Sequence, residues 1–210
     1  MFSTYLFDLD GTLIDSTDLI MESFRHTMRR HLGDVPDERA WRDGFGAPLR
    51  AQLAKFARNA GEADAMRSTY REYNHQHHDR LVRQYPGVRT ALEVLRKRGV
   101  TLAIVTSKTR ELAWRGLRWC ALDEYFKVLV GVEDVTECKP HPEPVLTAIE
   151  RVATDAAEAL FIGDSPHDIE AGCAAGVRTA AALWGPFEAD SFVSHRPHYW
   201  VSKPSEIPEL

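Results

Sequence analysis

Short apolar runs alternate with helical patterns along most of the chain. These runs predict five buried strands and a short sixth one, at residues 4–7, 101–105, 126–130, 159–162, 179–183 and 199–201. Apolar residues at helical spacing predict intervening helices at about 88–98, after 109, at 142–152 and at about 166–175. Strands that alternate with helices form a parallel sheet with helices on both faces. The pattern therefore predicts an α/β fold with a doubly wound parallel sheet.

The segment 16–81 differs from the rest because it contains no run typical of a buried strand. Its apolar residues recur at helical spacing in successive stretches, which predicts an all-helical insert of short antiparallel helices. The insert comes directly after the first predicted strand. The expected organisation is a core of residues 1–15 and 82–210, with a small helical domain of residues 16–81 inserted into it.

Composition and charge narrow the possible partners. The 210 residues suffice for one large domain or for one domain with a small insert, and the formal net charge of −5 argues against nucleic acid and anionic membranes. No apolar stretch approaches the length of a membrane-spanning helix, and the first residues lack the pattern of a secretory signal, so we expect none. Cys120, Cys138 and Cys173 lack metal-ligand spacing and are interpreted as reduced thiols. We expect a cytoplasmic monomer or homodimer.

Two aspartates follow the first predicted strand. Alternation along an extended segment places Asp8 and Asp10 on the same side, and Gly11 then favours a turn. Two carboxylates held together repel each other unless a cation or a shared proton lies between them. A hard divalent metal on oxygen ligands would satisfy the pair, but an ordinary polar junction between a strand and a turn contains the same residue types. The pair alone leaves both interpretations open.

Three further signals follow predicted strands in order. Thr106 ends the second apolar run, Lys139 lies after the third, and Asp164 ends the fourth, four residues before Asp168. Together with Asp8-Leu9-Asp10-Gly11-Thr12-Leu13, this succession resembles the motifs of the haloacid dehalogenase (HAD) superfamily. The resemblance implies a Rossmann-like core with the strand order 5-4-1-2-3 and a phosphohydrolase activity. Ligands of such sheets bind beyond the carboxyl ends of the strands, where we expect these residues to lie.

The resemblance also implies catalytic roles. Asp8 would attack phosphorus and form an aspartyl-phosphate, and Asp10 would protonate the leaving oxygen and later activate a water. The second aspartate argues against a dehalogenase. Lys139 would supply positive charge, and the hydroxyl and backbone N–H groups at Thr106 and Ser107 would bind phosphate oxygens. A helix N-cap explains the two hydroxyl residues equally well, and a lone lysine before a proline is often a solvated surface residue.

The cofactor that the resemblance implies is Mg²⁺. With Asp8 and the backbone carbonyl of Asp10, Asp164 would ligate the ion, and Asp168 would orient a water or a ligand nearby. As an alternative, Asp168 is simply a favourable acid at the start of a helix. Within the first motif, the residues expected to bind substrate are Gly11 and Thr12.

The insert should determine specificity. Its position resembles that of the helical cap in the phosphoglycolate phosphatase-like branch of the HAD superfamily, and its loop 46–50 would use Arg50 to hold a substrate anion. The stretches 74–81 and 23–27 instead resemble the HAD-type bacterial inorganic pyrophosphatase. Whether the histidines of 74–81 face the active site is left open; they are His75, His77 and His78.

We therefore expect a Mg²⁺-dependent phosphohydrolase that acts on a small phosphorylated metabolite similar to phosphoglycolate. Inorganic pyrophosphate is a close alternative because of the likeness of the insert. Two further alternatives are a phosphomutase and a non-catalytic binding protein with the same fold. Retention of the whole set of clustered carboxylates argues against the non-catalytic alternative, because a site without activity has no physical need for them.

Overall fold

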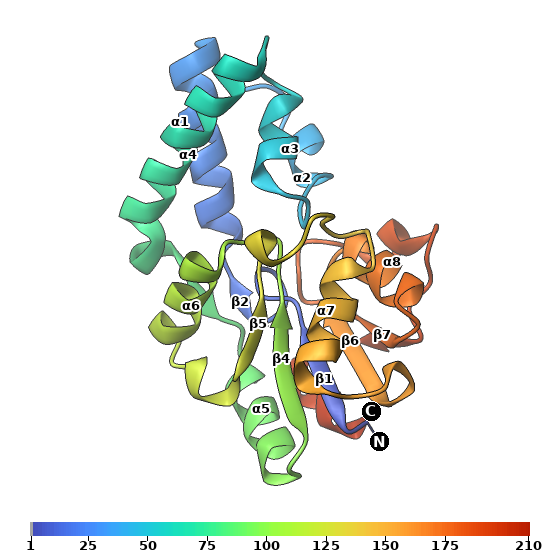
Figure 1. Cartoon of the computed structure of the whole chain (residues 1–210). Helices are drawn as coiled ribbons and strands as arrows, with labels where there is room; N and C mark the ends of the chain where they lie inside the picture. Colours follow the sequence, from blue (N-terminus) through green and yellow to red (C-terminus); the bar gives the residue numbers. More distant parts are fainter. Residues whose placement is uncertain (1) are drawn as a thin grey trace.

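The computed structural model describes residues 2–210. Six parallel strands form one sheet in the order β5-β4-β1-β6-β7-β8, with β1 between β4 and β6 (Figure 1). The strands are β1 (Thr4–Phe7), β4 (Thr101–Val105), β5 (Val128–Val130), β6 (Ala159–Gly163), β7 (Arg178–Ala182) and β8 (Tyr199–Val201). The first five strands of this sheet, taken in chain order, have the relative order that the family resemblance implied. The predicted doubly wound parallel sheet is confirmed.

Helices cover both faces of the sheet. They are α5 (Val88–Lys97), α6 (Arg110–Trp119), α7 (Glu143–Val152) and α8 (Pro166–Ala174). Because side chains alternate along a strand, Phe7 packs in a cluster with Leu92 of α5 and Leu117 of α6, whereas Leu6 packs in the opposite cluster with Val145 of α7. This two-sided burial explains why the central strands are apolar throughout.

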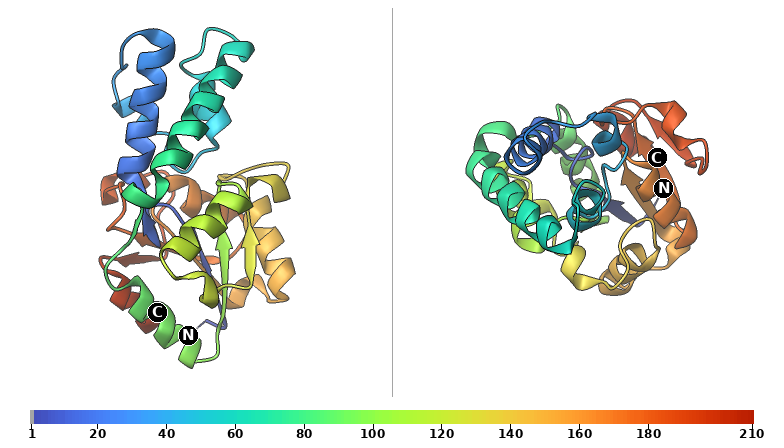
Figure 2. Two further views of the ribbon diagram at one scale, coloured as in Figure 1. Left: turned by 90° about the vertical axis from the view of Figure 1, so that its left-hand side faces the viewer. Right: turned by 90° about the horizontal axis from the view of Figure 1, so that it is seen from above.

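Four helices form a separate bundle, and we call their residues 17–81 the helical bundle. They are α1 (Thr17–Leu32), α2 (Arg39–Arg42), α3 (Leu49–Ala54) and α4 (Ala60–Leu81). Figures 1 and 2 show that the bundle stands beyond the carboxyl ends of the strands, with α1 and α4 packed along each other. The bundle has its own hydrophobic cluster, in which the rings of Phe24 and Trp41 stack with their centroids 4.5 Å apart.

A two-stranded antiparallel ribbon joins the bundle to the sheet. Its strands are β2 (Ile14–Asp15) and β3 (Arg83–Gln84), which flank the bundle in the sequence. The sequence pattern did not predict this ribbon, because two residues per strand are too few to show alternation. Since both connections run through one paired element, the start of α1 and the end of α4 are held side by side.

Local boundaries follow ordinary rules. Helix α1 ends at Gly33, whose left-handed backbone (φ 81°) lets its N–H donate to the carbonyl of Arg29, as expected for a glycine stop. Strand β5 begins at Val128, later than predicted, because a 3₁₀ turn at Asp123–Tyr125 precedes it.

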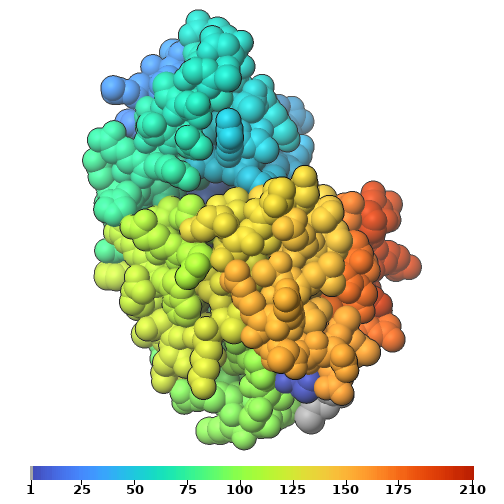
Figure 3. Space-filling view, in the orientation of Figure 1, coloured from blue at the N-terminus to red at the C-terminus, as the bar shows by residue number. Residues whose placement is uncertain are grey.

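Figure 3 shows the bundle in contact with the core on this face of the molecule. Among residues 2–210, no helix combines the length and apolar character needed to cross a membrane.

Candidate active site

Four residues predicted from the sequence meet at the carboxyl edge of the sheet. Asp8 follows β1, Thr106 follows β4, Asp164 follows β6, and Lys139 comes from the loop between β5 and α7. Each side chain is buried, with residue exposures of 2–5%. The parallel topology explains the gathering, since all strands end at the same edge of the sheet.

Lys139 is the central cation of this cluster. Its Nζ donates to Asp8 Oδ1 at 2.8 Å, to Asp168 Oδ1 at 2.6 Å and to the carbonyl of Val105 at 3.1 Å. Burial favours the neutral amine, but Asp168 and Asp8 outweigh it and raise the pKa of Lys139. The ammonium therefore stays charged beside the Asp8 carboxylate.

Asp168 serves this lysine and its own helix. Its Oδ2 accepts from the backbone N–H of Ser165 at 3.0 Å and from Ser165 Oγ at 2.6 Å, which forms a capping box at the start of α8. Gly163 leaves room for this carboxylate, because a Cβ there would lie 2.3 Å from Asp168 Cβ. Lys139 and Ser165 therefore occupy both oxygens of Asp168, which links the lysine to the start of α8.

Asp8 and Asp164 supply oxygens that fit a hard divalent cation. One ligand atom from each of Asp8, Asp164 and Asp168 lies within 4.8 Å of the others, and no histidine or cysteine joins this group in the described chain. Burial raises the pKa of Asp8 to about 7 although Lys139 opposes the shift, and burial followed by the charges of Asp168 and Asp8 raises that of Asp164. A bound cation would relieve this repulsion, so the donor set fits a metal.

Two glycines make room for Asp164. A Cβ at Gly11, whose φ is +87°, would lie 2.3 Å from Asp164 Oδ2, and a Cβ at Gly185 would lie 2.5 Å from Asp164 Cβ. The remaining oxygen, Asp164 Oδ1, accepts from Thr12 Oγ1 at 2.9 Å. Gly11 and Thr12, which the family resemblance predicts to bind substrate, both contact Asp164 here, and Gly11 also lines the cavity described below. Gly185 was not identified from the sequence.

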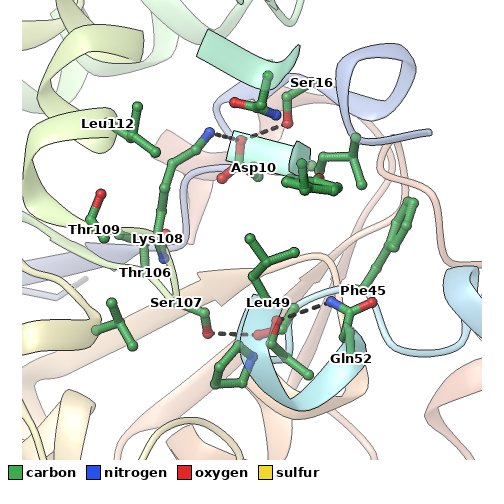
Figure 4. Close-up of a pocket in the computed structure, with 18 of the residues that line it drawn as sticks. Asp10, Ser16, Phe45, Leu49, Gln52, Thr106, Ser107, Lys108, Thr109 and Leu112 are labelled. Atoms are coloured by element: carbon green, nitrogen blue, oxygen red, sulfur yellow. Dashed lines mark hydrogen bonds and ion pairs between the residues drawn. The ribbon is translucent and has the colours of Figure 1, made fainter. Parts of the chain in front are cut away.

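Asp10 lies closer to solvent and has partners that the sequence did not reveal. Its Oδ1 accepts from Ser16 Oγ at 2.6 Å and from Lys108 Nζ at 2.6 Å (Figure 4). Ser16 stands directly before α1, and Lys108 lies in the loop after β4. The carboxylate is thus tied both to the start of the bundle and to a lysine of the core.

The two hydroxyl residues after β4 have different environments. Thr106 Oγ1 accepts from the backbone N–H of Lys108 at 3.2 Å, whereas Ser107 Oγ donates to the carbonyl of Gly46 in the bundle at 2.6 Å (Figure 4). Gly46 approaches the core closely, since a Cβ there would lie 2.7 Å from Ser165 Oγ. The Ser107 hydroxyl therefore links core and bundle in this conformation, and its backbone N–H is the group left to meet an anion.

A cavity of about 320 Å³ lies between these core residues and the bundle. Its core side includes Asp8, Asp10, Asp164 and Lys108. Its bundle side includes Arg50, as the sequence suggested, and also four residues of α4, namely Arg67, Tyr70, Arg71 and Asn74. Helical spacing on α4 could have indicated that these four share a face, but only the fold shows that this face meets the edge of the sheet with Asp8 and Asp164.

The histidines of α4 lie outside the lining of this cavity. His78 is fully buried and its Nδ1 lies 2.7 Å from Asp79 Oδ1, while the ring of His77 stacks on Tyr73 with centroids 3.9 Å apart. His75 is exposed, and its carbonyl accepts from Arg115 at 3.1 Å. The question that the sequence left open is answered for this conformation, because Asn74 is the member of the motif that faces the cavity.

The family description "Haloacid dehalogenase-like hydrolase" matches residues 5–182. This match covers most of the chain, and the fold and the acidic site agree with it. The chain belongs to the haloacid dehalogenase-like hydrolases, and it is a HAD phosphatase. Phosphatases of this family generally use a divalent metal, which the buried carboxylates suit.

Particular relatives refine this placement. A protein of Caldanaerobacter subterraneus subsp. tengcongensis, provisionally named pyrophosphatase PpaX, is 43% identical over 196 residues, 93% of this chain and 88% of that protein. Pyrophosphatase PpaX of Bacillus pumilus is 38% identical over 205 residues, 98% of this chain and 94% of that protein. Among solved structures, a Lactobacillus plantarum protein provisionally named phosphoglycolate phosphatase superposes with a TM-score of 0.86 at 26% identity, covering 100% of this chain and 99% of that one.

Proposed function

We propose that this protein is a Mg²⁺-dependent phosphohydrolase that cleaves inorganic pyrophosphate through an aspartyl-phosphate. The observation that carries the reaction class is the buried Asp8 carboxylate, 2.8 Å from the ammonium of Lys139 and grouped with Asp164. The substrate is supported by the relatives named pyrophosphatase PpaX, which match over nearly the whole chain. We place the protein in the cytoplasm, and its three unbridged cysteines are consistent with a reducing compartment.

The first half-reaction transfers a phosphoryl group to the protein. An oxygen of Asp8 attacks phosphorus, the bond from phosphorus to the bridging oxygen breaks, and Asp10 gives its proton to the departing phosphate. Lys139 holds the attacking carboxylate, and the backbone N–H of Ser107 would meet the phosphoryl oxygens, because the N–H of Thr106 already donates to the carbonyl of Val130 at 3.0 Å. Mg²⁺, held by Asp8, Asp164 and the carbonyl of Asp10, would neutralise charge on the transferred group.

The second half-reaction returns Asp8 to its starting state. Asp10, now a carboxylate, takes a proton from a water, and this water attacks the phosphorus of the aspartyl-phosphate. The bond between phosphorus and the Asp8 oxygen breaks, and inorganic phosphate leaves. We assign residues 16–81 as a cap that shields this site from bulk water while the intermediate exists. The contact of Ser107 with Gly46 supports a closed position of this cap.

A small phosphorylated metabolite similar to phosphoglycolate is the second candidate substrate. The cavity of about 320 Å³ does not separate the two candidates by size, because pyrophosphate and phosphoglycolate have the same number of non-hydrogen atoms. Apolar bundle residues, among them Ile20 and Leu49, also line this space. The structural likeness to the Lactobacillus plantarum protein agrees with this candidate.

Mg²⁺-dependent release of phosphate from a panel of compounds tests the proposal. The panel contains pyrophosphate, phosphoglycolate, several sugar phosphates and p-nitrophenyl phosphate, with Asp8→Asn as the control. We expect the highest kcat/KM for pyrophosphate, and loss of turnover by about a thousandfold or more in the variant because the nucleophile is gone. Preference for phosphoglycolate would select the second candidate, and near-normal turnover of Asp8→Asn would exclude the aspartyl-phosphate mechanism.

Two other activities would give different results in the same assay. A phosphomutase would release little phosphate and would convert one sugar phosphate into another, because it returns the phosphoryl group to a sugar. A non-catalytic binding protein would release phosphate from no compound. Calorimetry with Mg²⁺ completes the test, since absence of binding at millimolar concentrations contradicts a metal-dependent hydrolase.

A further inference from the structure

The bundle side of the cavity is cationic. Three arginines of the bundle line it, Arg50 from α3 and Arg67 and Arg71 from α4, and no aspartate or glutamate of the bundle is among the described lining residues. The core side is mainly acidic, because Asp8, Asp10 and Asp164 line it together with Lys108. Residues 17–81 include ten aspartates and glutamates, and none of them lines the cavity, so the excess of positive charge is specific to this face of the bundle.

The two arginines of α4 are not required by the fold. Arg71 is exposed and makes no ion pair or side-chain hydrogen bond with residues 2–210. Arg67 makes only a 3.3 Å ion pair with Asp64, whose side chain is 52% exposed, and pairs of this kind contribute little to stability. Their guanidinium groups are therefore available to a ligand.

Helix geometry places these two arginines together. Arg67 and Arg71 are four residues apart, so they are neighbours on one face of α4, and Tyr70 and Asn74 line the cavity beside them. Tyr70 and Asn74 are almost fully buried, and Asn74 Nδ2 donates to Ser23 Oγ of α1 at 3.3 Å. The packed residues fix the face of α4 that lines the cavity, and the two arginines lie on that face.

A substrate that spans the cavity must suit both sides. One phosphoryl group meets Lys139 and the cation held by the carboxylates, and the rest of the molecule meets the arginines. Guanidinium groups bind phosphate and carboxylate oxygens through paired hydrogen bonds. A neutral leaving group would leave those arginines without a partner, whereas a second anionic group would satisfy them.

We infer that Arg67 and Arg71 bind a second anionic group of the substrate, which is the departing phosphate in the case of pyrophosphate. They thereby select substrates with two separate anionic groups, which we call doubly anionic substrates. This inference rests on the proposed phosphohydrolase function and extends it to residues that determine specificity. Both arginines act by binding the part of the substrate that leaves, so they also hold it in line with Asp8 for the attack.

Paired substrates test the inference. We measure kcat/KM for pyrophosphate and phosphoglycolate, which carry a second anion, and for p-nitrophenyl phosphate, whose leaving group is uncharged before transfer. In Arg67→Ala and Arg71→Ala we expect kcat/KM for the doubly anionic substrate to fall roughly tenfold to a hundredfold, the usual range for a lost hydrogen bond to a charged group. For p-nitrophenyl phosphate we expect a change of less than about threefold.

Three further measurements separate loss of anion binding from general effects of substitution. Arg30→Ala removes the same charge from an exposed position of α1 outside the cavity and should leave both classes of substrate unchanged. Arg71→Lys keeps the charge without the planar fork and should restore part of the loss. Imidodiphosphate, which resists hydrolysis, should inhibit p-nitrophenyl phosphate cleavage with an inhibition constant that rises in Arg71→Ala.

The outcomes distinguish this inference from the proposed substrate. If the wild type cleaves phosphoglycolate but not pyrophosphate and the arginine variants lose that activity selectively, the substrate proposal fails and the inference holds. If the variants affect p-nitrophenyl phosphate as much as the doubly anionic compounds, or if Arg30→Ala has the same effect, the inference is overturned. It is also overturned if the wild type cleaves only p-nitrophenyl phosphate.

Discussion

The ammonium of Lys108 lies 2.6 Å from Asp10 Oδ1, and this ion pair joins the loop after β4 to the first motif of the chain. Ser16 Oγ donates to the same oxygen at 2.6 Å from the position directly before α1. A single carboxylate oxygen is thus held from two sides, and the orientation of Asp10 depends on both the core and the start of the bundle.

Loss of this ion pair should impair the chemical step. In Lys108→Met we expect kcat to fall by about tenfold or more, because a misplaced acid–base group loses much of its catalytic contribution. Single-turnover phosphate release measures the effect directly. Ser16→Ala should give a smaller loss in the same direction, and Lys108→Arg should recover part of the activity. An unchanged kcat in Lys108→Met would show that Asp10 needs no such support.

The buried pair of Lys139 and Asp168 should contribute to stability as well as to the site. Asp168→Asn leaves the buried ammonium with Asp8 as its one anionic partner and weakens the capping of α8. We expect the free energy of unfolding to fall by about 3 kcal/mol, as for buried ion pairs that lose one member. Urea denaturation measures this change.

Glu143→Gln provides the control for that stability measurement. Glu143 accepts two backbone N–H groups, from Thr136 at 2.9 Å and from Glu137 at 2.8 Å, but it is only half-buried. Replacement of the carboxylate by an amide should therefore lower the free energy of unfolding clearly less at Glu143 than at Asp168. Equal losses in the two variants would assign the effect of Asp168 to capping alone.

Metal affinity should increase with pH. Burial, which outweighs Lys139, raises the pKa of Asp8 to about 7, and a carboxyl group must lose its proton to ligate Mg²⁺. We expect the affinity for Mg²⁺ to rise as the pH increases toward 7, with proton release, and to level off above it. Calorimetry in buffers of different ionisation enthalpy counts the released protons. Affinity that is constant between pH 6 and 8 would contradict this expectation.

The same pKa shift has a consequence for stability without metal. The folded protein holds the Asp8 proton more tightly than the unfolded chain, in which the pKa is near 3.8. The stabilisation that Asp8 contributes to the folded protein is fully present below about pH 4 and is lost as the pH rises through about 7. Asp8→Asn should remove this part of the pH dependence, which urea titrations between pH 4 and 8 can measure. A slope identical to that of the wild type would exclude Asp8 as its source.

Substitution of Gly185 should weaken metal binding, because this residue leaves the space that Asp164 occupies. In Gly185→Ala the new Cβ would lie 2.5 Å from Asp164 Cβ and 2.7 Å from the carbonyl oxygen of Gly11, so Asp164 must move. We expect the affinity for Mg²⁺ to fall by about tenfold or more, since displaced support around ligands commonly has this effect. Gly61→Ala, with its nearest atom at 3.4 Å, is the matched control and should bind Mg²⁺ normally.

Local sequence pattern was enough to predict the sheet and the edge at which the acidic residues gather. Each central strand is a short apolar run buried on both faces, and Asp8, Thr106 and Asp164 stand directly after such runs. Because parallel strands end at one edge, local pattern was sufficient to bring these residues together. The family resemblance then supplied the strand order and the chemistry.

Tertiary structure alone decided the remaining contacts. The ribbon of β2 and β3 pairs residues about 70 positions apart, and two-residue strands carry no periodic signal. Lys108 and Gly185 have no distinctive motif, and their importance arises from a distance to Asp10 in one case and from the absence of space beside Asp164 in the other. Periodicity places Arg71 and Asn74 on α4, but the packing of the bundle on the core decides that they, and not the neighbouring histidines, face the cavity. Local patterns report which face of an element is buried, whereas the partner of that face depends on how distant segments pack.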